Sequence, residues 1–423
     1  MLATILKAFT VSEIRRKLAF TAAMLALYRF GSHIPVPGIN VDAVQSIEDQ
    51  FKGASILNFL NLFSGGGLQR FAVFALGIMP YITASIILQL LTVVVPTLEK
   101  LQKEGEVGQA RITQYTRYLT VGLAVAQSIG YVFLFRSFQD QAGTAVIENF
   151  NAPKVFLIVT ALTAGTILLM WFGELITQRG IGNGISLMIF ASIVAGLPNG
   201  VQAWATNADQ VFKVMMPFLA LAVIAAIVFV QEGQRRIPVQ YAKRVIGKRM
   251  SGGGQTYLPL RVNMAGVIPV IFAASIMAFP PTVGELIQTG WAQSLSNFFN
   301  PNGWAYVAGE TVFIVLFTYF YTAVTFNPVD QADNLKKYGG FIPGVRPGRP
   351  TAEFLDRILA RLTFPGSLYL AAVAAFPTIL INQTSANFFF GGTSLLIVVG
   401  VALDTMKQLE AQLMMRNYEG FLK

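Results

Sequence analysis

The chain has 423 residues, of which 54% are hydrophobic and only 12% are charged, whereas ordinary soluble domains carry about 25% charged residues. One histidine and no cysteine leave almost no material for disulfides, Cys/His zinc sites or histidine-activated nucleophiles. The net charge of +10 would suit nucleic acid, anionic lipid or an acidic partner, so the positions of the charges must decide. Long unbroken apolar runs exclude a membrane β-barrel, which would alternate apolar and polar residues. The composition predicts an all-α integral membrane protein, in which we expect no catalytic residue, metal or cofactor.

The first predicted element is a retained membrane helix. Four basic residues precede an apolar run over 18–28, an arrangement that resembles a signal peptide. No small-residue cleavage site follows, so we interpret this run as a helix that stays in the protein. His33 lies near the end of the same span, and we interpret it as an interfacial polar residue. The basic residues are Lys7, Arg15, Arg16 and Lys17.

Ten helical spans of roughly 20 residues are predicted from stretches without Asp, Glu, Lys or Arg, because a charge at the bilayer centre is costly. The last two spans share one charge-free run over 362–403, which is too long for one crossing. We divide it at the polar stretch INQTSAN. In chain order the spans are 18–36, 71–95, 118–135, 155–173, 185–204, 214–231, 262–283, 311–327, 364–381 and 388–406.

The basic residues predict the orientation of these spans. If both termini and the even-numbered connections lie on one side, that side holds most of the 31 Lys and Arg residues. The positive-inside rule then places both termini in the cytoplasm, with the protein in the cell membrane. The exceptions on the other side are Arg29, Lys52, Arg70, Arg136, Lys154 and Lys213.

Two cytoplasmic connections, 232–261 and 327–361, are long and basic, and we interpret them as docking surfaces. In the second, Pro and Gly residues on both sides of Arg346 predict a tight turn with Arg346 at its tip. The alternative is that these charges only orient the chain near anionic lipid. The predicted docking residues are Arg235, Arg236, Lys243, Arg244, Lys248, Arg249, Lys336, Lys337 and Arg346.

Several segments are similar to one membrane protein family. They include RFGSHIPVPGIN, NLFSGGGLQRFAVFALGIMPYITASIILQLL, ITQRGIGNGIS, LPLRVNMAGVIP and ADNLKKYGGFIPGVRPGRP, and they occur in the family's order over nearly the whole chain. The sequence resembles the SecY family, whose members form the pore of the general protein-export channel. The glycines of ITQRGIGNGIS lack the preceding strand of a nucleotide loop. We expect them to allow a tight turn between spans four and five.

The resemblance implies a fold and a function. The fold is ten transmembrane helices in two pseudo-symmetric halves of five, 1–207 and 208–423, with a re-entrant plug helix and a central hourglass pore. The function is to move unfolded secretory polypeptides across the plasma membrane and to release membrane-protein segments laterally into it. Expected partners are the SecE and SecG membrane subunits, the SecA ATPase, the ribosome, signal sequences, nascent polypeptides and membrane lipid.

The resemblance also assigns the site residues. An apolar ring would close the pore, because such a constriction resists wetting yet does not trap a passing polypeptide. Polar contacts across a lateral gate, between spans two and seven, would involve Gln89, Thr92 and Asn263. The ring residues are Ile78, Ile82, Ile185, Ile189, Ile271 and Ile397. The plug, near 61–70, contains Asn61, Leu62, Phe63, Ser64, Gly65, Gly66, Gly67 and Leu68.

Two other classes of protein remain as alternatives. A secondary transporter would need ionisable coupling residues at the membrane midplane, and most of the predicted spans contain none. An intramembrane enzyme would need a catalytic Asp pair, a Ser-His pair or metal ligands within the spans, and the sequence shows none of these there.

Overall fold

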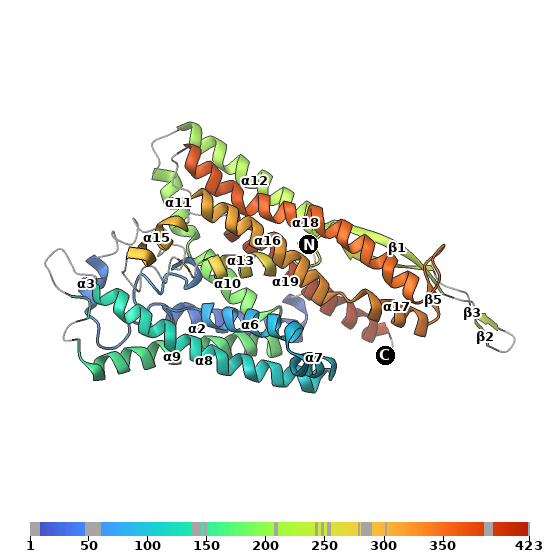
Figure 1. The fold of residues 1–423 in the computed structure, drawn as a ribbon, viewed down its shortest axis with the longest axis horizontal. Coiled ribbons are helices and arrows are strands. Elements are labelled where there is room, and N and C mark those ends of the chain that lie inside the picture. The colour runs from blue at the N-terminus through green and yellow to red at the C-terminus, as the bar shows by residue number, and fades with distance from the viewer. Residues whose placement is uncertain are drawn as a thin grey trace. The chain divides into compact units, whose positions relative to one another are not determined.

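The computed structural model describes residues 9–46, 61–137, 145–147, 150–206, 210–241, 244–246, 249–251, 255–277, 280, 290–300, 303–384 and 392–421. It is mostly helical, with short antiparallel strands (Figure 1). The helices are α2 (Ser12–Gly31), α3 (Val41–Ser46), α6 (Met79–Val94), α7 (Pro96–Lys103), α8 (Glu106–Ser137), α9 (Ala152–Arg179), α10 (Gly184–Ala195), α11 (Leu197–Thr206), α12 (Gln210–Glu232), α13 (Ile268–Met277), α15 (Gly290–Phe298), α16 (Trp304–Thr325), α17 (Pro328–Lys337), α18 (Arg349–Thr384) and α19 (Gly392–Phe421). The strands are β1 (Gln234–Tyr241), β2 (Arg244–Ile246), β3 (Arg249–Ser251), β4 (Gln255–Arg261) and β5 (Gly340–Phe341).

The chain divides into two compact units. The first unit comprises Met1–Asn207, Ala274–Val307 and Val401–Lys423. The second unit comprises Ala208–Ala273 and Ala308–Gly400. Each unit therefore takes segments from more than one part of the chain, and the two pseudo-symmetric halves stay a prediction.

Seven helices within the described ranges are long and apolar enough to cross a membrane. An eighth span is reached if α6 and α7, which are bent by 99° at the break between them, count as one. The charge-free run over 362–403 forms two separate helices, because α18 ends at Thr384 and α19 begins at Gly392, as predicted. The full count of ten spans stays a prediction.

The second predicted span starts later than expected. Residues 71–78 carry no charge and so fall within the predicted span, but they form turns, and α6 begins only at Met79. Phe71 and Gly77 both have positive φ, which takes the backbone out of a helix. Phe71 is fully buried. Burial in protein favours the same apolar residues as lipid does, so hydrophobicity alone cannot separate the two environments.

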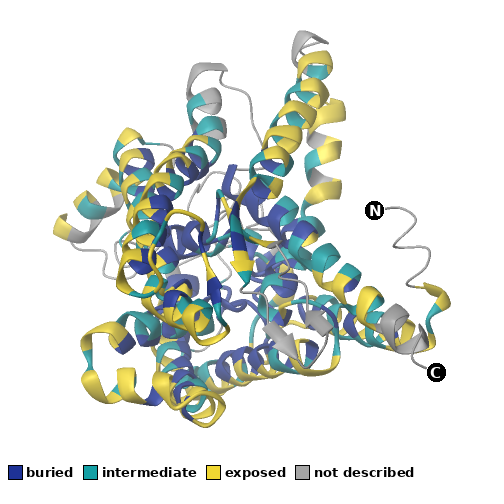
Figure 2. Cartoon of the chain, turned by 90° about the vertical axis from the view of Figure 1, so that its right-hand side faces the viewer, coloured by how far each residue is buried: buried dark blue, intermediate teal, exposed yellow. Residues whose placement is uncertain are grey.

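Buried and exposed residues occur along the same helices (Figure 2). On α9, Phe156 and Trp171 are exposed, whereas Ile158 and Leu169 are fully buried. A helix that is hydrophobic on all faces suits a membrane span, where lipid covers the outer face.

In the first unit, α8 packs against α6, α7 and α9, and α10 packs against α9 (Figure 1). The turn between α9 and α10 is as tight as ITQRGIGNGIS predicts. Gly182 has a φ of 89°. Asn183 caps α10 by accepting hydrogen bonds from the backbone N–H groups of Ile185 and Ser186. A Cβ at Gly184 would lie 1.9 Å from the carbonyl oxygen of Gly173, so glycine is required for this close approach.

The second unit contains a three-stranded sheet with the order β4-β1-β5. β1 pairs antiparallel with β4 along its length, from Gln234↔Arg261 to Gln240↔Gln255. β5 pairs with the other edge of β1 through Gln240↔Phe341 and Tyr241↔Gly340. A buried hydrophobic cluster lies beneath the sheet, and we call the sheet and this cluster the sheet platform. The cluster comprises Ile237, Val239, Leu260, Phe326, Ile342, Leu355, Ile358 and Leu359.

Candidate functional site

The predicted plug lies in a compact stretch of turns. One helical turn is described over 61–63, and turns then follow through residue 70. Phe63, Ser64 and Leu68 are buried, so this is not a solvent-exposed loop. Gly65 and Gly66 have φ values of 63° and 86°, which glycine adopts without the strain that other residues would suffer.

Hydrogen bonds close the plug segment on itself. The side chain of Asn61 accepts from the backbone N–H of Gln69 and donates to the Gln69 side chain, both at 3.0 Å. Ser64 Oγ accepts from the backbone N–H of Leu68 at 2.9 Å. The backbone N–H of Gly66 donates to the Asn61 carbonyl at 3.0 Å. These bonds make the segment one small folded body.

The predicted pore residues lie on four helices. Ile78 directly precedes α6, and its carbonyl accepts from the backbone N–H of Ile82 at 3.1 Å, so the two residues lie one turn apart. Ile185 and Ile189 lie on α10. Ile271 lies on α13 and Ile397 on α19. The first four belong to the first unit and the last two to the second. Ile185 is half-buried and the others are buried.

The predicted gate residues make local hydrogen bonds. Thr92 is buried on α6, and its hydroxyl donates to the carbonyl of Gln89 at 2.6 Å. Asn263 is buried between β4 and α13, and its amide nitrogen donates to the Gly266 carbonyl at 2.9 Å. Its buried oxygen Oδ1 has no hydrogen-bond partner within the described part of the chain. A contact across the gate stays a prediction.

The two predicted docking loops are joined in the sheet platform. Arg235 and Arg236 are exposed on β1, and Lys336 and Lys337 are exposed in the last turn of α17. Pairing of β5 with β1 ties these two loops together through backbone hydrogen bonds. Arg244 and Arg249 lie on the β2–β3 hairpin, whereas Lys243 and Lys248 lie outside the described residues. Sequence reasoning missed this sheet.

Arg346 is exposed in a loop with a fixed backbone. A turn precedes it, in which the N–H of Val345 donates to the carbonyl of the buried Ile342 at 3.0 Å. The Thr351 hydroxyl donates to the Arg346 carbonyl at 2.8 Å and ties the loop to α18. Gly344 and Gly348 have positive φ on either side. The guanidinium is therefore presented to solvent by a well-held backbone.

An ionisable residue that the sequence reasoning overlooked lies inside a span. α16 begins at Trp304, seven residues before the predicted span, and so includes Glu310, which is 4% exposed. The transporter alternative requires ionisable groups at mid-membrane. Glu310 instead lies near the beginning of α16, and a lone carboxyl group there does not make a coupling site.

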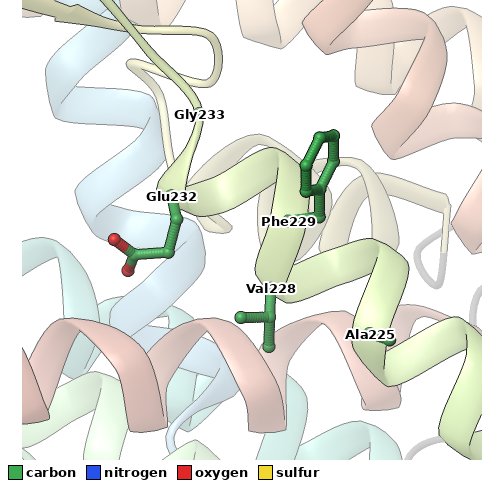
Figure 3. Close-up of a pocket in the computed structure, with 5 residues that line it drawn as sticks. All are labelled: Ala225, Val228, Phe229, Glu232 and Gly233. Carbon is green, nitrogen blue, oxygen red and sulfur yellow. The ribbon is translucent and has the colours of Figure 1, made fainter.

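A hollow of about 630 Å³ lies along the end of α12 in the second unit (Figure 3). Its wall is almost entirely apolar, with Phe229 81% exposed beside it. Its lining residues are Ala225, Val228, Phe229, Glu232 and Gly233. One carboxylate in an apolar wall provides no catalytic arrangement, and the hollow suits contact with an apolar chain.

Comparison with known proteins identifies the family. The family model described as SecY matches residues 72–406. The chain belongs to the SecY family. The protein translocase subunit SecY of Streptomyces scabiei is 50% identical over 439 aligned residues, which cover 100% of both chains. The SecY subunit of Mycobacterium tuberculosis H37Rv is 47% identical over 100% of both chains. As a member of the SecY family, the chain is a multi-pass membrane protein and a protein translocase subunit.

Solved structures show the same fold. A structure described as that of a protein conducting channel matches with a TM-score of 0.66 and 18% identity, over 94% of this chain and 92% of the other. Sec61 in the canine ribosome-channel complex matches with a TM-score of 0.62 and 17% identity over the same shares. At these identities the likeness concerns the fold of this SecY-family chain and not the roles of single residues.

Proposed function

We propose that this SecY-family chain forms a protein-conducting channel of the plasma membrane. It moves unfolded secretory polypeptides across the membrane and releases membrane-protein segments sideways into lipid. The observation that carries this proposal is its identity of 50% to a translocase subunit over the whole length of both chains. The likeness in fold to channel structures supports it. The chain hydrolyses nothing itself, so partners supply the energy.

The proposed channel has ten spans in two halves, 1–207 and 208–423, around an hourglass pore. Ile78, Ile82, Ile185, Ile189, Ile271 and Ile397 form its constriction. Aliphatic side chains offer no hydrogen bonds or charges, so they exclude water and ions at rest without binding a passing polypeptide. The compact, glycine-hinged segment 61–70 serves as the plug, since irregular backbone is tolerated at membrane depth only where protein or a water-filled cavity surrounds it.

The proposed lateral gate uses Gln89 and Thr92 on one side and Asn263 on the other. The unsatisfied, buried Oδ1 of Asn263 supports this role, because it is an acceptor that lacks a partner in the described part of the chain. A hydrogen bond between membrane helices contributes about 0.6 to 2 kcal/mol. Such a weak contact suits a gate that an apolar signal helix has to open.

The proposed partners dock on the cytoplasmic side, where both termini also lie. The exposed basic residues of the sheet platform and Arg346 would bind the SecA ATPase or a translating ribosome, while SecE and SecG bind within the membrane. Two of the structurally similar channels are described in complexes with ribosomes, the canine Sec61 and the yeast Ssh1 complex. A guanidinium held as Arg346 is can bind carboxylate or phosphate in a bidentate way.

Reconstitution tests the proposed function. The purified chain, placed in liposomes with its membrane subunits and SecA, should move a signal-bearing precursor into a protease-protected lumen when ATP is present. The same precursor without its signal is the control and should stay outside. Equal protection of both precursors, or of neither, would contradict the proposal.

Ion conductance tests the pore ring separately. Replacing Ile78, Ile82 and Ile189 with Ser should let ions leak through the resting channel, because polar side chains allow the constriction to wet. Ile167 is an exposed isoleucine on α9, so Ile167→Ser is a matched control that should leave the resting conductance unchanged. A ring variant that leaks no more than this control would rule out the ring.

A further inference from the structure

The plug segment is attached to the first helix by a charged side chain. Arg29, in the last turn of α2, donates a hydrogen bond from Nη1 to the carbonyl oxygen of Gly65. Arg29 is half-buried. Hydrogen bonds from a charged donor are shorter and stronger than neutral ones.

A glycine makes this attachment possible. A Cβ at Gly65 would lie 2.6 Å from Tyr28 Oη and 3.4 Å from the Cα of Ser192. The Tyr28 hydroxyl is itself hydrogen-bonded to Ser192 Oγ on α10, at 2.5 Å. The carbonyl of Gly65 therefore reaches Arg29 only because no side chain stands between the plug segment, α2 and α10.

A second contact joins the far end of the plug segment to the same helix end. Arg70 Nη1 donates to His33 Nε2 at 2.9 Å, and His33 Nδ1 lies 2.8 Å from the carbonyl oxygen of Arg29. A guanidinium can only donate, so Nε2 is the acceptor and Nδ1 carries the proton that binds Arg29. His33 thus bridges the two arginines, a role that its position near a helix end did not predict.

The chain just after residue 70 is held differently, by backbone and ring contacts. The N–H of Val36 donates to the Phe71 carbonyl at 3.1 Å, and the N–H of Val73 donates to the Ile34 carbonyl at 2.9 Å. The ring of the fully buried Phe71 packs on Phe135 of α8, with 4.0 Å between ring centroids. Residues 71–73 therefore anchor the chain, and the backbone N–H of Ala72 also donates to the Gly67 carbonyl at 2.8 Å. Segment 61–70 is tied to the end of α2 by the side chain of Arg29 and, through His33, by that of Arg70.

We infer that Arg29 is a positioning residue that latches the plug segment in its resting place, with the His33–Arg70 contact as a second, weaker latch. When the segment moves, Arg29 and Arg70 exchange their protein acceptors for water, so no charge is left buried and unpaired. Gly66 and Gly67 lie between the latched carbonyl of Gly65 and the anchor at residue 71, where a hinge is needed. This inference rests on the proposed channel function and adds a regulatory contact to it.

Hydrogen exchange of the full chain in liposomes tests the latch. In Arg29→Met, which keeps an unbranched apolar side chain but removes the donor, amides of the peptide 63–71 should exchange roughly tenfold faster, since bonds to charged groups are the stronger class. Arg16→Met is the matched control, because Arg16 is an exposed arginine near the other end of α2. Exchange of α8 and α9 should be unchanged in both variants. If the peptide 63–71 exchanges in Arg29→Met at the same rate as in the wild type, the inference is wrong.

Arg70→Met provides a second test that does not risk the fold, because Arg70 is exposed. It should accelerate exchange of the peptide 63–71 several-fold, less than Arg29→Met does. If Arg29→Met instead lowers protection throughout α8 and α9, that variant has disturbed the fold and Arg70→Met becomes the test. Wild-type exchange of the peptide 63–71 in Arg70→Met would then refute the latch.

Conductance distinguishes failure of the latch from failure of the channel. The ring variant of Ile78, Ile82 and Ile189 serves as the reference for an open pore in the same liposomes. If the ring variant leaks and Arg29→Met exchanges at the wild-type rate, the latch is refuted but the channel assignment is not. If Arg29→Met exchanges faster while the ring variant does not leak and the reconstituted chain moves no precursor, the latch is supported and the channel assignment is refuted.

Discussion

The plug segment and the sheet platform are held in place by different kinds of contact. Segment 61–70 makes hydrogen bonds within itself and buries Phe63 and Leu68. It is tied to the end of α2 by the side chain of Arg29 and, through His33, by that of Arg70. The sheet platform instead buries a cluster of aliphatic and aromatic residues and pairs strands from two distant loops. The two arginine contacts can be exchanged for contacts with water one at a time, whereas the larger cluster of the platform must be exposed as a whole. This difference agrees with the proposed roles of the two regions, a plug that moves and a platform on which partners dock.

The largest effect is expected from a cavity in the sheet platform. Leu355 is fully buried in the cluster, and Leu355→Ala should destabilise the platform by about 2 to 5 kcal/mol. Limited proteolysis and hydrogen exchange should show faster opening of residues 234–261. Leu368→Ala, at an exposed leucine on the same helix, is the matched control and should change little. Equal loss of protection in both variants would show that the cluster does not hold the loops.

The next largest effect is expected from reversing the charge of Arg346, in the loop that follows β5. Arg346→Glu should weaken binding of the cytoplasmic motor by roughly 1.5 to 3 kcal/mol, since a charged hydrogen bond is lost and repulsion is added. The melting temperature should not change, because the contact of Thr351 is to the backbone of Arg346. Arg349→Glu is the matched control, because its side chain is 91% exposed and pairs with Glu353 on the next turn. An unfolded Arg346→Glu protein, or one with normal affinity, would make Arg346 a structural residue.

Most of the spans could be predicted from the sequence because the free-energy cost of placing a charge in the bilayer interior dominates their composition. Charges are excluded from the bilayer interior, so charge-free runs mark α9 and α12 closely. They also locate a span within α8, α18 and α19, although each of these helices extends well beyond its predicted span at one end. The prediction was wrong where apolar residues are buried in protein, as at Phe71, or where a helix tolerates a buried acid, as at Glu310. Local composition does not report either environment.

The contacts that join distant segments could not be predicted. The apolar residues Ile237 and Val239 lie two positions apart, a period-two signal in the sequence that could have indicated β1. Its pairing with Gly340 and Phe341 joins residues about a hundred positions apart, and no local pattern encodes that. The plug segment was located only by family resemblance, and its attachment to Arg29 and His33 depends on backbone turns that only the structure shows.

A smaller effect is expected from a methyl group beneath the plug segment. Gly77 has a φ of 58°, and a Cβ there would lie 3.0 Å from the Phe63 carbonyl oxygen. Gly77→Ala should cost about 1 to 2 kcal/mol, from the left-handed backbone alone. Exchange of 63–71 should quicken while the sheet platform stays protected. Gly122→Ala, on α8 where the methyl group meets nothing within 4 Å, is the control and should not loosen the segment.

The smallest effect concerns the edge at which β5 joins the sheet platform. A Cβ at Gly340 would lie 3.0 Å from a ring carbon of Tyr241 and 3.3 Å from a methyl of Val239. Both contacts are with side chains, and the backbone at Gly340 does not have a positive φ, so Gly340→Ala should cost only about 0.5 to 1 kcal/mol. Ile342, which precedes the loop of Arg346, belongs to the buried cluster. If this cluster holds the loop, the small loss of stability in Gly340→Ala should leave motor binding unchanged. Gly340→Val adds bulk at the same point and should weaken β1–β5 pairing further, which hydrogen exchange at Tyr241 and Phe341 would show. A different outcome would be that Gly340→Ala reduces motor binding as much as Arg346→Glu does. In that case the β1–β5 pairing, and not the hydrophobic cluster, positions the loop of Arg346. The sheet platform would then not be held mainly by its buried cluster.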